Sequence, residues 1–228
     1  MSETDVRIFP LGDSALTIEF GNTVSTALNK KAIDLSNYFE QSQFPGFVES
    51  VPGYASTTVF YDIVKVRKHF HDFPTAFEAV KNLAIAAIDG LAASQKGGSL
   101  IVEIPVYFDA KSAPDLVLVA KTNGLSPQAV IEIFTAATYR VFMLGFLPGF
   151  SYMGEVDDRL AMPRKDSPRI VVPAGSVGIV GKQTGIYSLA SPGGWQIIGR
   201  TDAQMFTPDA ATPCLLQPGD EVRFVAVK

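Results

Sequence analysis

One stretch of the chain combines flexible backbone, an indole and a cation. The segment SPGGWQIIGR, residues 191–200, contains the only tryptophan, Trp195, directly after two glycines, and it ends at Arg200. Glycines let a ligand approach the main chain closely, but they also form tight turns in a core. A ligand site and a core turn are therefore both open interpretations of this segment.

The sequence around this segment is rich in cations. Residues 159–200 contain six basic residues and one acidic residue, Asp166, although the net charge of the whole chain is −4. The basic residues are Arg159, Arg164, Lys165, Arg169, Lys182 and Arg200. A solvated surface usually mixes both signs, so this local excess favours a pocket for a carboxylate or a phosphate.

Neutral hydrogen-bonding groups and glycines lie between these cations. The candidate substrate-binding residues are Arg169, Gly175, Ser176, Gln183, Thr184, Tyr187, Gly193, Gly194, Trp195, Gln196 and Arg200. A second candidate wall, for a pocket or a partner surface, is the aromatic loop with Phe146, Pro148, Gly149, Phe150 and Tyr152. A purely structural β-barrel could have the same composition, and this alternative also stays open.

Two other kinds of site are not expected. Residues 175–184, GSVGIVGKQT, miss the pattern of a phosphate-binding loop, which needs a glycine where Ser176 stands and a hydroxyl where Gln183 stands. The only histidines, His69 and His71, have no obvious third ligand, and the single cysteine excludes a cysteine-based zinc site. No metal site is therefore predicted in this chain.

Charge and hydropathy argue against nucleic acid and membrane as partners. Residues 119–133 resemble a helix-turn-helix, but there is no lysine or arginine between Ser126 and Tyr139, where a recognition helix would need them. We expect two packed helices instead. No apolar stretch approaches the roughly 18 residues of a membrane span, and the N-terminus has no apolar signal core. These features predict a cytoplasmic protein.

The elements that position these residues follow two different patterns along the chain. The first 93 residues show strand and helix spacing in the order ββαββα. The expected elements are a hairpin over 6–20, a helix over 24–39, strands over 47–51 and 56–66, and a helix that Pro74 opens. This order predicts a small α+β domain over residues 1–93, with both helices on one face of a sheet.

The pattern changes after a small, polar linker at residues 92–99. Residues 140–200 hold ten of the nineteen glycines, and short β-type runs there are separated by glycine and proline turns. This pattern predicts a closed or sandwich-like β domain over residues 99–228, with a helical insertion at about 114–136.

Three segments resemble a known family. They are LGFLPGFSYMG, PRKDSPRIVVPAGSVGIVGKQTGIYSLASPGGWQIIGRT and LLQPGDEVRF. They are similar to the family of 5-oxoprolinase B subunits, also called allophanate hydrolase subunit 1, the Kip kinase-inhibitor family, or carboxyltransferase subdomains C and D. The likeness spans the whole chain and is strong from Ile104 to Val225. It implies that the second domain is a cyclophilin-like β-barrel.

The resemblance also implies an activity and partners. The family's assembled complexes open the lactam of 5-oxo-L-proline to L-glutamate with ATP and Mg²⁺, and no cofactor is expected to bind tightly to this chain alone. The implied partners are a C-type subunit (allophanate hydrolase subunit 2) and a LamB/YcsF-type subunit, without which the chain is expected to be inactive. The alternatives are an inhibitor of a sensor histidine kinase and a carboxyltransferase subunit of the urea carboxylase or allophanate hydrolase type.

On this resemblance, residues of the opening segment acquire roles. Gly193 and Gly194 would place backbone amides next to a small anionic substrate, with Trp195 as a wall. Gln196 would bind an amide of the substrate. Because the surrounding sequence has few acids, the general base and the Mg²⁺ ligands are expected on a partner.

Two arginines and two departures from the family complete the expectations. Arg169 or Arg200 would hold the substrate carboxylate. Phe134 follows Ile133 where the family usually has a histidine after a leucine, and Ser151 stands where proline is usual. The missing histidine leaves a different substrate, or a regulatory role, open.

Overall fold

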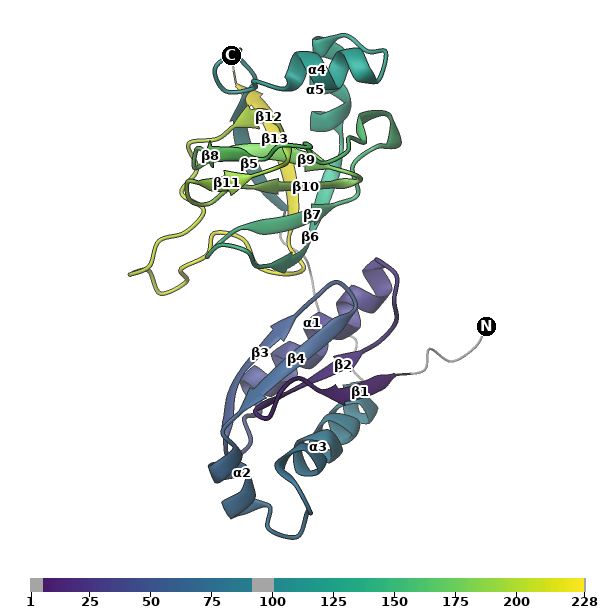
Figure 1. The fold of residues 1–228 in the computed structure, drawn as a ribbon, viewed down its shortest axis with the longest axis vertical. Helices are drawn as coiled ribbons and strands as arrows, with labels where there is room; N and C mark the ends of the chain where they lie inside the picture. Colours follow the sequence, from purple (N-terminus) through teal and green to yellow (C-terminus); the bar gives the residue numbers. More distant parts are fainter. Residues whose placement is uncertain (1–5, 92–100, 228) are drawn as a thin grey trace. The chain divides into compact units, whose positions relative to one another are not determined.

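A computed structural model describes residues 6–91 and 101–227. The chain divides into two compact units, Met1–Gly98 and Ser99–Lys228, called here the N-terminal unit and the barrel unit (Figure 1). The predicted linker, residues 92–99, lies outside the described residues. Together the units form a mixed fold of helices and strands that includes a closed barrel.

The N-terminal unit is a four-stranded antiparallel sheet with helices packed against it. Its strands are β1 (Arg7–Pro10), β2 (Ala15–Glu19), β3 (Phe47–Pro52) and β4 (Ser56–Tyr61), in the spatial order β1-β2-β4-β3. Its helices are α1 (Thr26–Gln41), α2 (Ile63–His69) and α3 (Ala76–Leu91). Leu16 and Val59 of the sheet share one buried cluster with Leu35 of α1 and Val80 of α3. The predicted hairpin and the placement of both long helices on one face are confirmed.

Helix α1 begins and ends two residues later than the predicted range 24–39, and two further predicted boundaries in this unit are wrong. The strand expected over 56–66 ends at Tyr61, because the side chain of Asp62 accepts a hydrogen bond from the backbone of Lys65 and caps the short helix α2. Helix α3 begins later than Pro74 suggested, since the hydroxyl of Thr75 accepts a hydrogen bond from the backbone N–H of Glu78. In both cases a local cap decides where the helix starts.

The barrel unit is closed, so the sandwich alternative is wrong. The barrel strands are β5 (Ile101–Tyr107), β6 (Thr138–Leu144), β7 (Ser151–Gly154), β9 (Ser176–Val180), β10 (Gln183–Ile186), β12 (Gln196–Arg200) and β13 (Glu221–Val227). Their order around the barrel is β10-β7-β6-β13-β5-β12-β9, with β13 parallel to β5. A separate two-stranded ribbon pairs β8 (Arg169–Val172) with β11 (Ser191–Gly193).

Two short helices form the predicted insertion between β5 and β6. They are α4 (Leu116–Thr122) and α5 (Pro127–Ala136), and a single 3₁₀ turn, η1 (Asp158–Leu160), follows β7. Gly124 ends α4 with a φ of 66°, and the side chain of Ser126 caps α5. Both helices pack against one end of the barrel and share its core (Figure 1). None of the helices within the two described ranges has the length and apolar character needed to span a bilayer.

Candidate functional site

A cavity of about 330 Å³ lies in the barrel unit beside the only tryptophan. Its walls come from three segments that are distant in the sequence. The lining residues are Phe146, Phe150 and Tyr152, then Arg164 and Pro168, then Tyr187, Pro192, Gly193, Gly194 and Trp195. The aromatic loop and the glycine–tryptophan segment therefore meet at one place, called here the Trp195 cavity.

Aromatic rings pack edge to face along the apolar wall of this cavity. The ring of Phe150 lies 5.5 Å from that of Trp195 and 5.2 Å from that of Tyr187, at interplanar angles of 88° and 87°. Tyr152 contacts the same ring at 4.8 Å. Edge-to-face pairs add to the stabilisation from burial. Trp195 is only 4% exposed, so the indole is both a core residue and a wall of the cavity, which unites the two interpretations of its segment.

Phe146 stands at the mouth of the cavity in an unfavourable backbone conformation. Its φ is 67°, the left-handed region that a bulky residue rarely adopts, and the residue is 61% exposed. Its ring meets the rings of Phe150 and Tyr187 at 5.6 and 6.5 Å. Backbone strain of this kind costs about 1–3 kcal/mol and concentrates at functional sites. The loop therefore holds an apolar ring in solvent at the entrance.

The two glycines before the tryptophan make room for side chains of the protein itself. A β-carbon on Gly193 would lie 2.8 Å from Cε1 of Tyr187, and one on Gly194 would lie 3.0 Å from Cγ of Arg164. Both distances are shorter than ordinary van der Waals contacts. The glycine pair is required for the ring and the arginine stem to reach the cavity, whatever its part in binding a ligand.

Arg164 supplies the positive charge of the Trp195 cavity. Within residues 6–91 and 101–227 no hydrogen bond or ion pair engages its guanidinium. Burial raises the pKa of Tyr152 and of Tyr187 above the ordinary value, and the Arg164 charge opposes this rise in both. The two phenols therefore stay protonated at neutral pH and can donate hydrogen bonds. A cation beside two phenol donors suits a small carboxylate.

Arg169, one of the two predicted carboxylate-binding residues, is engaged elsewhere. Its Nη2 donates to Oδ1 of the buried Asp115 at 2.7 Å, and Lys165 donates to the same oxygen at 3.2 Å. The other predicted residue, Arg200, lies on β12 opposite Ser176 of β9. Neither arginine lines the Trp195 cavity.

The positive excess inferred from the sequence is smaller in three dimensions. Acids from outside residues 159–200 pair with four of the six bases. The pairs are Arg159 with Asp157, Lys182 with Asp158, and both Lys165 and Arg169 with Asp115. The broad positive excess inferred from composition is therefore smaller in space, because acids from outside this range neutralise part of the charge. Arg164 remains as the cation at the cavity.

The other candidates outside the cavity have structural contacts. They are Gly175, Ser176, Gln183, Thr184, Gln196, Pro148 and Gly149. Thr184 donates from its hydroxyl to the carbonyl of Gly178 across β9 and β10, and Gln196 donates to the carbonyl of Pro163. Gly175 turns the chain with a φ of 80°. A ligand role for these residues stays a prediction.

Arg164, Pro168 and Pro192 were missed as lining residues. Arg164 belongs to the segment PRKDSP, residues 163–168, which begins and ends with a proline. Prolines at both ends predict an extended loop, and this signal could have pointed to Arg164 as a residue of the site. Which of the neighbouring cations faces the cavity could not be read from their order in the chain.

Phe134, at the position where the family resemblance implies a histidine, is a core residue here. It is fully buried on α5 and stacks on Phe224 of β13 with ring centroids 4.8 Å apart. Tyr139 packs against both rings and donates its hydroxyl to the carbonyl of Phe134. An aromatic hydrocarbon suits this apolar cluster better than an imidazole.

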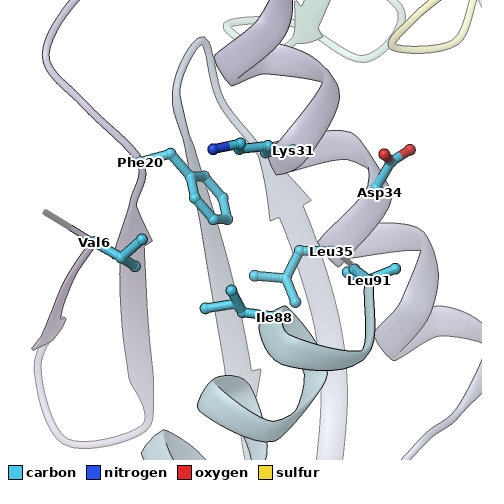
Figure 2. A pocket seen from close by; sticks show the side chains of 7 residues that line it. All are labelled: Val6, Phe20, Lys31, Asp34, Leu35, Ile88 and Leu91. Atoms are coloured by element: carbon cyan, nitrogen blue, oxygen red, sulfur yellow. The ribbon is translucent and has the colours of Figure 1, made fainter. Parts of the chain in front are cut away.

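A second cavity, of about 240 Å³, lies in the N-terminal unit (Figure 2). It is lined by Val6, Phe20, Lys31, Asp34, Leu35, Ile88 and Leu91. Figure 2 shows the apolar side chains of Phe20, Leu35 and Ile88 facing one another, with Lys31 and Asp34 at the edge. Ligand sites combine apolar walls with convergent polar groups, so the Trp195 cavity is the better candidate.

Curated proteins of similar sequence share nearly the whole chain. The 5-oxoprolinase B subunit of Bacillus subtilis is 45% identical over 97% of this chain and 92% of its own length. The protein of the same name from Escherichia coli O157:H7 is 38% identical over 97% and 96%. Urea amidolyase of Saccharomyces cerevisiae is 28% identical, and this chain covers 13% of it.

Solved structures agree with this relationship. The crystal structure of TTHA0988 matches 94% of the chain with a TM-score of 0.80 and 36% identity, while this chain spans only 39% of that protein. The protein PH0987 of Pyrococcus horikoshii is 41% identical over 97% of both chains, with a TM-score of 0.55. Residues 6–216 also match the family model of the carboxyltransferase domain, subdomain C and D. This chain therefore belongs to the carboxyltransferase subdomain C and D family.

Proposed function

We propose that this chain is the B subunit of a 5-oxoprolinase, a complex that opens 5-oxo-L-proline to L-glutamate with hydrolysis of ATP. The observation that carries the proposal is the 37–45% identity, over at least 96% of the chain, to three proteins that bear this name. The Trp195 cavity supports it, because residues of the family-like segments line a hollow with one cation and two phenols.

In this proposal the chain binds and orients the substrate. Arg164, with the hydroxyls of Tyr152 and Tyr187, binds the carboxylate, and the ring of Trp195 packs on the apolar face of the lactam. Resonance makes the lactam amide slow to react with water. ATP, when bound in the complex, would supply the activation of the amide oxygen. Hydrogen-bond donors aimed at that oxygen would stabilise the negative charge that develops on it as water adds to the amide carbon.

The remaining groups are proposed to come from the partners. Among the residues that the structure describes, no aspartate, glutamate or histidine lines the Trp195 cavity. Within the described ranges, no three histidine, cysteine, aspartate or glutamate residues form a cluster that could hold a metal ion, and the proposal places Mg²⁺–ATP on the partners. The general base and the Mg²⁺ ligands are assigned to a C-type subunit and a LamB/YcsF-type subunit. The chain alone is then inactive.

The finer architecture and the location belong to the same proposal. The two compact units correspond to separate domains, with the second, residues 99–228, being cyclophilin-like. The closed seven-stranded barrel supports this assignment. The assembled complex is assigned to the cytoplasm.

Reconstitution tests this function. The purified chain, each partner and the three together are assayed for phosphate release that depends on 5-oxo-L-proline. Activity is expected only in the mixture that contains all three proteins, with L-glutamate formed in step with phosphate. A complete mixture that hydrolyses ATP without forming glutamate contradicts the proposal, and turnover by the single chain contradicts the assignment of the base to a partner.

A further inference from the structure

Asp115 lies outside the Trp195 cavity but contacts the segment that forms one of its walls. Its side chain is 5% exposed, at the start of α4. Oδ1 accepts hydrogen bonds from Arg169 at 2.7 Å and from Lys165 at 3.2 Å, and Oδ2 accepts one from the backbone N–H of Ile197 at 2.7 Å. One buried carboxylate thus joins α4, β12 and residues 163–169.

Residues 163–169 depend on such contacts for their position. They contain neither helix nor strand until Arg169 begins β8. Beyond the two ion pairs, the backbone N–H of Lys165 donates to the carbonyl of Gly194 at 2.8 Å, and Gln196 donates to the carbonyl of Pro163 at 3.2 Å. A segment without regular structure has few backbone bonds of its own, so its position depends on these two hydrogen bonds and on the ion pairs to the buried Asp115.

Arg164 is carried by this segment into the cavity. Its stem passes over Gly194, whose β-carbon, if present, would lie 3.0 Å from Cγ of the arginine. Among the described residues, none forms a hydrogen bond or an ion pair with its guanidinium. The next residue, Lys165, is bound through both its side chain and its backbone N–H. The direction of Arg164 is therefore set by its neighbours in the chain.

We propose that Asp115 is a positioning residue of the Trp195 cavity. By binding Lys165 and Arg169, its carboxylate holds residues 163–169 against β12 and keeps Arg164 beside Trp195. Asp115 itself touches neither the cavity nor a ligand. The consequence for substrate affinity rests on the proposed function, whereas the position of Arg164 does not.

Fluorescence quenching of Trp195 in the purified full chain measures that position without any substrate. Iodide is an anion and acrylamide is neutral, so the ratio of their quenching constants reports positive charge beside the indole. The chain contains no other tryptophan. Arg164→Ala is expected to lower the ratio about two- to threefold, the effect of one nearby charge in a largely aqueous setting.

The Asp115→Asn variant distinguishes an effect of Arg164 position on the quenching ratio from an effect of net charge. This change makes the protein more positive, which by itself raises iodide quenching, yet the proposal predicts that the ratio falls as in Arg164→Ala because the arginine moves away. The double variant is expected to match the single Arg164→Ala variant or to lie slightly above it, since the displacement acts through Arg164 and only the change in charge remains. The matched control is Asp158→Asn, which removes an equal charge from an exposed ion pair with Lys182 and leaves the ratio unchanged or slightly higher.

Three results overturn the proposal: a folded Asp115→Asn variant with the wild-type ratio, a further fall in the double variant, or an equal fall in Asp158→Asn. If Asp115→Asn does not fold, Asp115→Glu keeps the charge on a stem one methylene longer. It is expected to displace the segment and lower the ratio by an intermediate amount. A folded Asp115→Glu variant with the wild-type ratio contradicts the proposal equally.

In the assembled complex, Asp115→Asn is expected to raise the KM for 5-oxo-L-proline about tenfold with a smaller change in kcat, and to add nothing in the Arg164→Ala background. A rise in KM that persists in that background overturns the positioning role. If Arg164→Ala itself leaves KM unchanged, the proposed substrate role of the cavity fails. The quenching ratios still test whether Asp115 holds Arg164 beside Trp195.

Discussion

The ring of Tyr187 lies against the backbone of Gly193 so closely that a methyl group cannot fit between them. A β-carbon on the glycine would be 2.8 Å from both Cε1 and Cζ of the ring. This contact sets the shape of the Trp195 cavity, because Tyr187 also packs edge to face on Phe150. The absence of a side chain at Gly193 is therefore a condition for the packing of the aromatic wall.

Gly193→Ala is expected to displace Tyr187 and to lower the activity of the assembled complex at least tenfold, with a loss of about 1–3 kcal/mol in the free energy of unfolding from overpacking. Urea unfolding and steady-state kinetics measure the two effects. The control is Gly90→Ala in α3, where a β-carbon meets nothing within 4 Å. That change is expected to stabilise the helix by roughly 0.5–1 kcal/mol and to leave activity unchanged. Equal activity of the two variants would show that the wall tolerates displacement.

Arg164→Ala is expected to raise the KM for 5-oxo-L-proline about ten- to a hundredfold, because a charge-assisted contact to a carboxylate contributes about 1.5–3 kcal/mol. Its control is Arg159→Ala, which removes an exposed arginine paired with Asp157 and should leave KM unchanged. Arg169→Ala should instead destabilise the fold by about 1.5–3 kcal/mol, since it removes a hydrogen bond to the buried Asp115. Because Arg169 also helps Asp115 to hold residues 163–169, its KM effect should be smaller than that of Arg164→Ala; a larger KM effect with full stability would return the carboxylate site to Arg169.

Trp195→Phe is expected to fold normally and to bind substrate less well, because phenylalanine keeps an aromatic ring but lacks the indole N–H donor. In a complex whose partners carry no tryptophan, 5-oxo-L-proline is expected to shift the emission of Trp195. The measurement is a fluorescence titration alongside the kinetics of Trp195→Phe. An unchanged spectrum at saturating substrate, together with full activity of the variant, would mean that the indole serves only the core.

Asp115 makes the stability of the chain depend on pH. Burial acts to raise the pKa of its carboxyl, but hydrogen bonds from Arg169 and the backbone of Ile197, with the nearby charges, lower it below the ordinary value. A carboxyl with a depressed pKa in the folded state contributes stability that is fully present above the unfolded pKa, about 3.9, and is lost as the pH falls through the folded value. The free energy of unfolding is therefore expected to drop below about pH 4 more steeply in the wild type than in Asp115→Asn. Parallel slopes in urea melts of the two proteins would contradict this.

Phe134→His, which restores the residue usual in the family, is expected to destabilise this chain and not to raise its activity. Phe134 is fully buried against Phe224, and an imidazole there lacks hydrogen-bond partners, at a cost of about 1–3 kcal/mol. Phe134→Leu is the apolar control and should cost less. Thermal unfolding and kinetics of the complex test both. A gain of activity in Phe134→His would reveal a catalytic role that the aromatic core conceals.

The local pattern of residue types was sufficient to predict much of the secondary structure. The spacing of apolar residues along α1, and the cap formed by Ser126 with Pro127 at the start of α5, involve neighbours in the chain, so they are visible in the sequence. The two boundary errors, at Asp62 and Thr75, also arise from local caps and could have been predicted from residue type. Composition could not choose between a barrel and a sandwich, because closure depends on pairing between distant strands such as β5 and β13.

The sequence by itself predicted that the aromatic loop and the glycine–tryptophan segment contribute to a site, and it left a purely structural barrel open as the alternative; the structure brings both segments to the Trp195 cavity. Only the tertiary structure decided which cation faces that site. Asp115, about fifty residues before its partners, binds Lys165 and Arg169 and leaves Arg164 at the cavity. Ion pairs of this kind depend on distances in space, not along the chain, so neither a local count of charges nor the order of residues in a basic run can reveal them.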